Sequence, residues 1–178
     1  YYDNEEHMLA VLESIFNKSN RKLGFNNGLG MTYEGLLTVK SIARAQAYYD
    51  LIQKVKEGKT SLKISERTKR VLPDFPKVAI TYSVTENDEE SMSNQAHMAK
   101  SLEDYNAMFD THFKLDTLKA YNADLNDRLA RKKDKYLNRS EQLDLVIVVD
   151  RLLTGFDAPC LSTLFMDRQP MKPQHLIQ

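Results

Sequence analysis

Four residues whose types could do chemistry follow a run of apolar residues near the end of the chain. The run, Leu145–Val149, leads into Asp150, and a short turn then brings Thr154, Gly155 and Asp157. A continuous apolar run rich in Val and Ile predicts a strand buried on both faces of a parallel sheet. Ligands of open α/β sheets bind just beyond the carboxyl ends of such strands. The two carboxylates, the hydroxyl and the glycine therefore stand where a functional site is expected.

Each of these residues also has an ordinary structural role. Asp150 could cap the next turn, and Thr154 could bond to its own backbone. Gly155 could supply a positive φ or let a ligand approach, and both roles can hold at once. Asp157 could form an Asx-turn, but as a ligand contact it would avoid phosphate and favour ribose hydroxyls or an arginine. We favour ligand contacts for Thr154 and Asp157, whereas for Asp150 this preference rests on the family resemblance given below. Arg151 stays open between a phosphate contact and a surface side chain.

Composition narrows the class of protein. The 178 residues suffice for one compact domain with an appendage, and the balance of 25 basic and 25 acidic residues gives no global argument for nucleic-acid binding. The single cysteine, Cys160, cannot pair within the chain, which points to a reducing compartment such as the cytoplasm. No apolar run is long enough for a membrane-spanning helix. Because the sequence starts without Met and stops at Gln178 without a helix-ending signal, we expect a fragment of a longer protein.

Strand and helix patterns alternate along the chain, which predicts a mostly parallel sheet with right-handed crossovers. The expected strands are Leu36–Val39, Val78–Tyr82, 144–150 and Leu161–Met166. Five helices are expected. The first follows an Asp3–Glu6 capping pair, and the second runs from Ser41 to about Glu57, before Gly58. The third carries the apolar residues from Met92 to Phe109, the fourth runs from about Asp116 to Lys133, and the fifth begins at Pro173. The glycine-rich stretch 21–35 and the polar stretch 59–76 are predicted as loops.

Several segments resemble the restriction (motor) subunit of type I restriction–modification enzymes. They are TVKSIARA at 38–45, VAITYSVTENDEES at 78–91, DLVIVVDRLLTGFDAP at 144–159, LSTLFMDR at 161–168 and HLIQ at 175–178. The resemblance implies a three-layer α/β/α RecA-like lobe, the second of a superfamily-2 helicase motor, over 36–178. Residues 1–35 would form an N-terminal helix and a glycine-rich linker. The segment 38–45 is similar to motif IV and 146–157 to motif V, and Gln178 would open motif VI.

The resemblance also implies roles for individual residues. The complete subunit is an ATP-driven DNA translocase and endonuclease that uses Mg²⁺ and works with methyltransferase and specificity subunits on double-stranded DNA. The residues expected on the nucleotide side, facing the first RecA-like lobe, are Asp150, Arg151, Gly155, Asp157 and Gln178. The residues expected on the DNA side are Lys40, Ser41, Ser83, Thr85 and Thr154. For Ser41 a helix N-cap is the favoured alternative. We expect no catalytic residue, metal site or ATPase activity in the fragment itself, because it has no phosphate-binding loop.

Two basic clusters could add contacts to DNA. One contains Arg128, Arg131, Lys132, Lys133 and Lys135, and the other contains Lys63, Arg67, Lys69 and Arg70. Cations gather at helix carboxyl ends for dipole reasons alone, so a solvated face is the favoured interpretation of the first cluster and DNA the minority one. The second cluster carries the same ambiguity. The four histidines show no metal-ligand spacing.

Two other functions remain open at this stage. One is the second lobe of another superfamily-2 DNA helicase that lacks a nuclease. The other is a non-catalytic module whose helices over 92–133 dock a partner subunit, and its marker would be a large exposed apolar patch on those helices.

Overall fold

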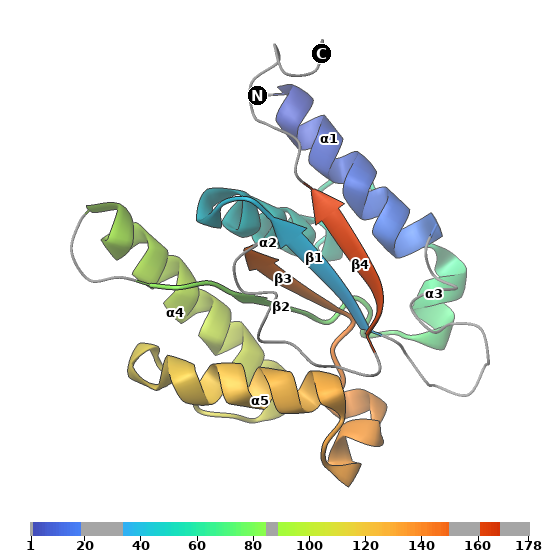
Figure 1. Ribbon diagram of the computed structural model, residues 1–178. Coiled ribbons are helices and arrows are strands. Elements are labelled where there is room, and N and C mark those ends of the chain that lie inside the picture. The colour runs from blue at the N-terminus through green and yellow to red at the C-terminus, as the bar shows by residue number, and fades with distance from the viewer. Residues whose placement is uncertain (1, 19–33, 85–88, 150–160, 168–178) are drawn as a thin grey trace.

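The computed structural model describes residues 2–18, 34–84, 89–149 and 161–167 (Figure 1). In chain order the longer helices and the strands are α1 (Tyr2–Glu13), β1 (Glu34–Val39), α2 (Ile42–Lys56), α3 (Glu66–Val71), β2 (Val78–Thr81), α4 (Glu89–Phe109), α5 (Leu118–Ala130), β3 (Leu145–Val149) and β4 (Leu161–Asp167). Short helical turns are η1 (Ser14–Lys18), η3 (Leu115–Thr117), η4 (Asp134–Leu137) and η5 (Arg139–Glu141). In the described ranges, no helix is both long and apolar enough to cross a membrane.

The four strands form one sheet in the order β2-β3-β1-β4, and every neighbouring pair is parallel. All five residues of β3 are buried, as expected of a strand with a neighbour on each side and cover on both faces. The sheet is flanked by helices, so the predicted α/β fold with a parallel sheet is confirmed. Since the strands are parallel, their carboxyl ends all lie at one edge, here called the carboxyl edge, and their starts at the opposite, amino edge.

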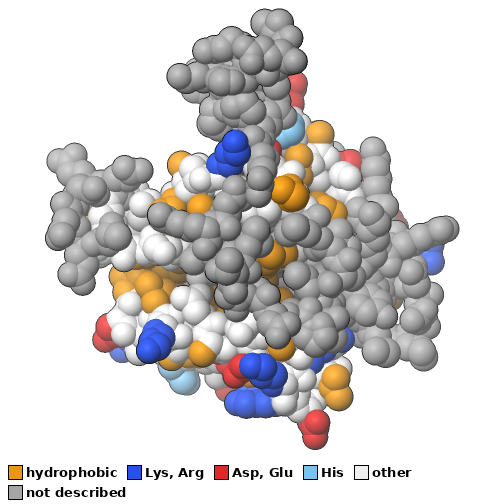
Figure 2. All heavy atoms as spheres, in the orientation of Figure 1, with side chains coloured by type: hydrophobic (Ala, Val, Ile, Leu, Met, Phe, Trp, Pro, Cys, Tyr) orange, Lys and Arg blue, Asp and Glu red, His pale blue; other side chains and the backbone are white. Residues whose placement is uncertain are grey.

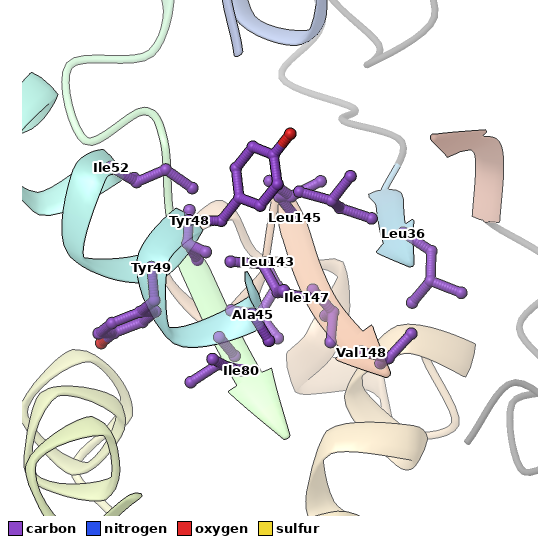
Figure 3. Packing of buried hydrophobic residues seen from close by; sticks show 14 of the residues in the cluster. Leu36, Ala45, Tyr48, Tyr49, Ile52, Ile80, Leu143, Leu145, Ile147 and Val148 are labelled. Atoms are coloured by element: carbon purple, nitrogen blue, oxygen red, sulfur yellow. The ribbon is translucent and has the colours of Figure 1, made fainter. Parts of the chain in front are cut away.

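Helix α2 packs on the sheet through an apolar face. Its Ala45 lies next to Ile80 and Ile147 of the two strands beneath (Figure 3), and its Tyr48 and Ile52 are fully buried as well. The helix begins after Ser41, whose hydroxyl accepts a hydrogen bond from the Arg44 backbone N–H at 3.1 Å. Gly58 follows the helix with φ of +75°, a conformation that favours glycine. The sequence predicted both ends of this helix correctly.

A charged cluster holds the strand starts together at the amino edge. The Asp144 carboxylate, at the start of β3, accepts hydrogen bonds from Arg139 Nη1 and Nη2 at 2.6 and 2.7 Å. It also accepts one from the backbone N–H of Lys77, which precedes β2, at 2.8 Å. The Asp144 carbonyl accepts from the backbone N–H of Gly35 in β1 at 2.8 Å. One buried residue therefore ties the starts of three strands together.

The structure corrects three sequence predictions. The stretch 59–76 is not all loop, because α3 forms within it behind a Ser65 cap that accepts from the Thr68 N–H at 3.2 Å. Asp3 lies inside α1, which begins at Tyr2, and so does not cap it. Strand β1 begins at Glu34, inside the stretch predicted as linker. The predicted helix at Pro173 and most of the predicted linker lie outside the described residues.

Candidate functional site

The carboxyl edge brings together residues that lie far apart in the sequence. Val39, at the end of β1, is in register with Val149 of β3 on one side and Asp167 of β4 on the other. Lys40 and Ser41 follow β1 directly, and Ser83 lies just past the end of β2. The parallel topology thus places the carboxyl ends of all four strands at one edge, which is where α/β proteins bind ligands.

Three of the predicted DNA contacts can be examined at this edge. The side chains of Lys40, Ser41 and Ser83 are all exposed. The predicted N-cap role of Ser41 is confirmed by its bond to Arg44. This bond uses only an acceptor lone pair of the hydroxyl, so the Ser41 O–H can still donate to a ligand. The Lys40 amine and the two serine hydroxyls at the carboxyl edge are suited to bind phosphate oxygens, which accept hydrogen bonds and carry negative charge.

Sequence reasoning missed one charged cluster at the same edge. Asp167, the last residue of β4, is 4% exposed, and its carboxylate accepts a hydrogen bond from the Tyr48 hydroxyl. It also lies 3.1 Å from His7 Nε2 and 3.7 Å from Arg44 Nε. The signal was available, since an apolar strand that ends on an acid, as in 161–167, repeats the pattern that singled out Asp150.

The Asp167 cluster joins α1, α2 and β4. Burial raises the pKa of the Tyr48 phenol above its ordinary value, and the hydrogen bond to Asp167 raises it further. Tyr48 is therefore a neutral donor to the carboxylate at physiological pH. Because a buried charge is tolerated only with close partners, the cluster fixes α1 against the carboxyl edge.

A second polar cluster imitates a catalytic triad but has no accessible nucleophile. His97 Nε2 lies 2.9 Å from Asp50 Oδ1, and Ser101 Oγ lies 3.4 Å from His97 Nδ1. The Ser101 side chain is buried, and its hydroxyl donates to the His97 carbonyl oxygen one turn earlier at 3.0 Å. This contact is local helix bonding, so the cluster links α4 to α2 without a reactive hydroxyl.

Comparison with known proteins decides the family. The profile of the family described as Type I restriction enzyme subunit R domain 3 matches residues 31–178. The chain belongs to this family.

Individual relatives agree with the assignment. The chain is 31% identical over 151 residues to a type I restriction enzyme endonuclease subunit of Staphylococcus saprophyticus, and 29% identical over 143 residues to one of Staphylococcus aureus. These matches cover 82% and 78% of the chain but 14% of each relative. A shorter match, 46% over 44 residues, covers 25% of the chain and 4% of the HindI endonuclease subunit of Haemophilus influenzae. The chain therefore spans about one seventh of the length of the first two relatives.

Within this R-subunit domain, the basic residues at the end of α5 do not all lie on the surface of the protein. Arg128 is 1% exposed, and its guanidinium bonds to Tyr105 Oη at 3.0 Å, Glu141 Oε2 at 2.8 Å and Asp124 Oδ2 at 3.1 Å. It also lies 3.8 Å from the centre of the Phe109 ring. Arg128 faces inward because Tyr121 and Leu125 precede it by seven and three residues on one helix face. Neither the solvated-face nor the DNA interpretation holds for Arg128, whereas Lys132, Lys133 and Lys135 are exposed.

The remaining predicted site residues of the R-subunit domain lie outside the described part of the chain. They are Thr85, Asp150, Arg151, Thr154, Gly155, Asp157 and Gln178. Their roles stay predictions. Within the residues that the structure describes, no group of three or more His, Cys, Asp or Glu side chains could hold a metal ion.

Proposed function

We propose that this chain is the second RecA-like lobe of the ATP-driven DNA motor in a type I restriction R subunit. The observation that carries the proposal is the all-parallel sheet whose carboxyl edge bears exposed Lys40, Ser41 and Ser83 beside the end of the buried strand β3. The family relation supports it, because the relatives carry the name of type I restriction endonuclease subunits. Since those relatives are much longer than this chain, translocation and cleavage are proposed for the parent subunit and not for the chain alone.

The DNA side of the site would bind phosphates. Lys40 contributes a positive charge, and the hydroxyls of Ser41 and Ser83, with those of Thr85 and Thr154, donate hydrogen bonds to the backbone of double-stranded DNA. Such contacts fix the position of the duplex and carry no sequence information. This suits a motor that must move along DNA of any sequence. Recognition of a particular site would belong to the specificity subunit.

The nucleotide side would close the ATP cleft against the first RecA-like lobe. The residues proposed to face it are Asp150, Arg151, Gly155, Asp157 and Gln178. Charge accumulates on the phosphoryl oxygens during ATP hydrolysis, so cations and hydrogen-bond donors there stabilise the transition state. No group of three or more His, Cys, Asp or Glu side chains among the described residues could hold a metal ion, so we assign no Mg²⁺ ligand to them.

Two alternatives are less well supported. The marker of a docking module would be a large apolar patch over 92–133, and the described part of that segment shows one large exposed hydrophobic side chain, Met92 at 72%. A helicase lobe without a nuclease is disfavoured because the relatives are named endonuclease subunits. For the parent enzyme, the proposal includes binding to methyltransferase and specificity subunits.

The two sides of the site can be separated in the full-length R subunit. We expect Asp157→Asn to abolish DNA-stimulated ATP hydrolysis while DNA binding persists, because the carboxylate serves the nucleotide side. We expect the double substitution Lys40→Gln with Thr154→Ala to weaken DNA binding while ATP hydrolysis persists at saturating DNA. Lys119→Gln, an exposed residue of α5, is the matched control. The proposal fails if neither variant differs from that control.

The isolated chain gives a further test. Without a phosphate-binding loop it should hydrolyse no ATP and cleave no DNA. A turnover above background by the purified 178-residue chain would contradict the assignment of the catalytic residues to other parts of the parent subunit.

A further inference from the structure

A concave surface with lysines at its rim lies at the amino edge, opposite the site described above. It has a volume of about 800 Å³ and is bordered by the end of α2, the loop before α3, α3 itself and the segment before β2. Its lysines are Lys56, Lys63, Lys69 and Lys77, and we call this surface the lysine groove. None of the residues that line the lysine groove has a role in the proposed site at the carboxyl edge.

The charge of the groove is local and strong. Residues 54–70 hold seven basic side chains and two acidic ones, whereas the whole sequence holds 25 of each. The lysines come from three separate segments that folding brings to one concavity, so their proximity is not a consequence of sequence neighbourhood alone. A basic patch on an otherwise neutral domain is the electrostatic signature of a polyanion-binding surface.

Internal partners do not fully account for these charges. Asp74 is the acidic residue of the lining, and it already lies 3.0 Å from Arg139 Nη2 and 3.8 Å from Lys77 Nζ. Lys69 lies 3.7 Å from Glu66, and both side chains are more than half exposed. The exposed Lys56 has no ion-pair partner among the described residues, and Lys63 donates to the neutral Gly58 carbonyl at 3.1 Å. The groove therefore keeps a net positive charge that an anion would neutralise.

Lys77 gives the floor of the groove a fixed cation. Its side chain is 7% exposed, and its amine donates to the backbone carbonyls of Ser140 at 2.8 Å and Arg139 at 3.2 Å. Burial lowers the pKa of this amine, and the nearby Arg139 charge lowers it further. A bound anion would offset the repulsion from Arg139.

The face shown in Figure 2 has a different distribution of charge. Over the lower part of that view, where α5 lies in Figure 1, basic and acidic side chains stand next to one another. Such a mixed surface attracts neither sign over a distance, because opposite charges cancel beyond a Debye length. It offers exposed lysines for a matched control.

We propose that the lysine groove is a second contact for the phosphate backbone of duplex DNA, on the opposite edge of the sheet from the proposed motor contacts. The choice of duplex DNA as the polyanion rests on the proposed function, in which the parent type I restriction R subunit moves along DNA. The groove holds phosphates through the exposed amines of Lys56, Lys63 and Lys69, and it reads no base sequence. DNA held there is a separate stretch from the one gripped at the carboxyl edge, or a part of the same duplex bent around the lobe.

The test compares two triple variants of the 178-residue chain with equal net charge. The groove variant is Lys56→Gln, Lys63→Gln and Lys69→Gln, and the control is Lys100→Gln, Lys114→Gln and Lys119→Gln, all of them exposed. Binding to a fluorescent 30-base-pair duplex is measured by anisotropy between about 50 and 200 mM salt. The groove variant should bind at least about tenfold more weakly than the control, and the slope of log K against log salt should fall by about 2 to 3.

Other outcomes overturn the proposal. An equal loss in both variants would show a general effect of net charge, and an unchanged groove variant would show that its lysines do not contact DNA. If poly-glutamate bound the groove and the duplex did not, the partner of the groove would be an acidic protein and not DNA. Replacing the same three residues by Arg keeps the charge and should restore DNA binding in a folded protein. Lys40→Gln reports on the carboxyl edge separately, so either assignment can fail without the other.

Discussion

The two edges of the sheet differ in how their polar side chains are used. At the amino edge, Asp144 is fully buried and held by both terminal nitrogens of Arg139 and by the Lys77 backbone. At the carboxyl edge, Lys40, Ser41 and Ser83 are exposed, and the buried acid Asp167 lies to one side of them. The amino edge thus fixes strand positions, while the carboxyl edge leaves donors free to meet ligands. Residues that stabilise the domain and residues that serve its proposed function are separated along the strands.

The largest effect is expected at the amino edge. Asp144→Ala removes two hydrogen bonds of the Arg139 guanidinium, which keeps only its contact with the exposed Asp74, and it leaves the Lys77 N–H without this acceptor. The free energy of unfolding should therefore fall by about 3–5 kcal/mol. Denaturant unfolding measures this loss. The control is Glu103→Ala, which removes an exposed acid from α4 and should change stability by less than about 0.5 kcal/mol. Equal stability of the two variants would show that the strand starts do not depend on Asp144.

A smaller loss is expected from the buried acid of the carboxyl edge. Asp167→Asn should lower the free energy of unfolding by about 3 kcal/mol, because the buried Arg44 guanidinium loses the negative charge of Asp167 while the amide oxygen still accepts from Tyr48. The matched control is Met166→Gln on the same strand, where the side chain is 51% exposed. A loss greater than that of Asp144→Ala would reverse the proposed difference between the edges.

The Tyr48 phenol makes stability at the carboxyl edge depend on alkaline pH. Its pKa is raised in the folded state, so above pH of about 10 the unfolded chain releases a proton that the folded chain keeps. The stabilising effect is complete below that pH and is lost as pH rises toward the folded-state pKa. Above pH 10, unfolding free energy should fall less steeply in Tyr48→Phe than in the wild type, by up to about 1.4 kcal/mol per pH unit. Parallel pH profiles of the two proteins would contradict this.

Ser41 should contribute about as much as an ordinary helix cap. Ser41→Ala removes the acceptor for the Arg44 N–H and should lower stability by about 1 kcal/mol, whereas Ser41→Asn should restore most of it. Ser83→Ala, at an exposed position after β2, should leave stability within about 0.5 kcal/mol. Thermal unfolding of the three variants gives the comparison. A large loss in Ser83→Ala would mean that Ser83 is structural and not available to ligands.

The sequence predicted what depends on local pattern. Five apolar residues were enough to identify β3, and Ser41 and Gly58 marked both ends of α2. Helix α3 was missed because its sequence, ERTKRV, has no apolar periodicity. Its main local signal is the Ser65 cap, and caps are weak evidence without an apolar face.

Partners distant in sequence were harder to foresee. Arg128 was grouped with the lysines that follow it, although Tyr121 and Leu125 already marked its helix face as buried. Asp167 meets His7 from 160 residues away, so no local pattern could pair them. The edge at which the candidate site lies followed from the expected parallel sheet, whereas the buried clusters that stabilise each edge required the tertiary structure.

The central claim, that the carboxyl edge faces DNA, can be tested by cross-linking. A photo-reactive phenylalanine analogue replaces Ser83 in the full-length R subunit, and in a second protein it replaces Lys119 on α5; both positions are exposed. The subunits are assembled with methyltransferase and specificity subunits on duplex DNA and irradiated. We predict a DNA cross-link from position 83 and none from position 119. Failure to cross-link at position 83, or equal yields at both positions, would contradict the account.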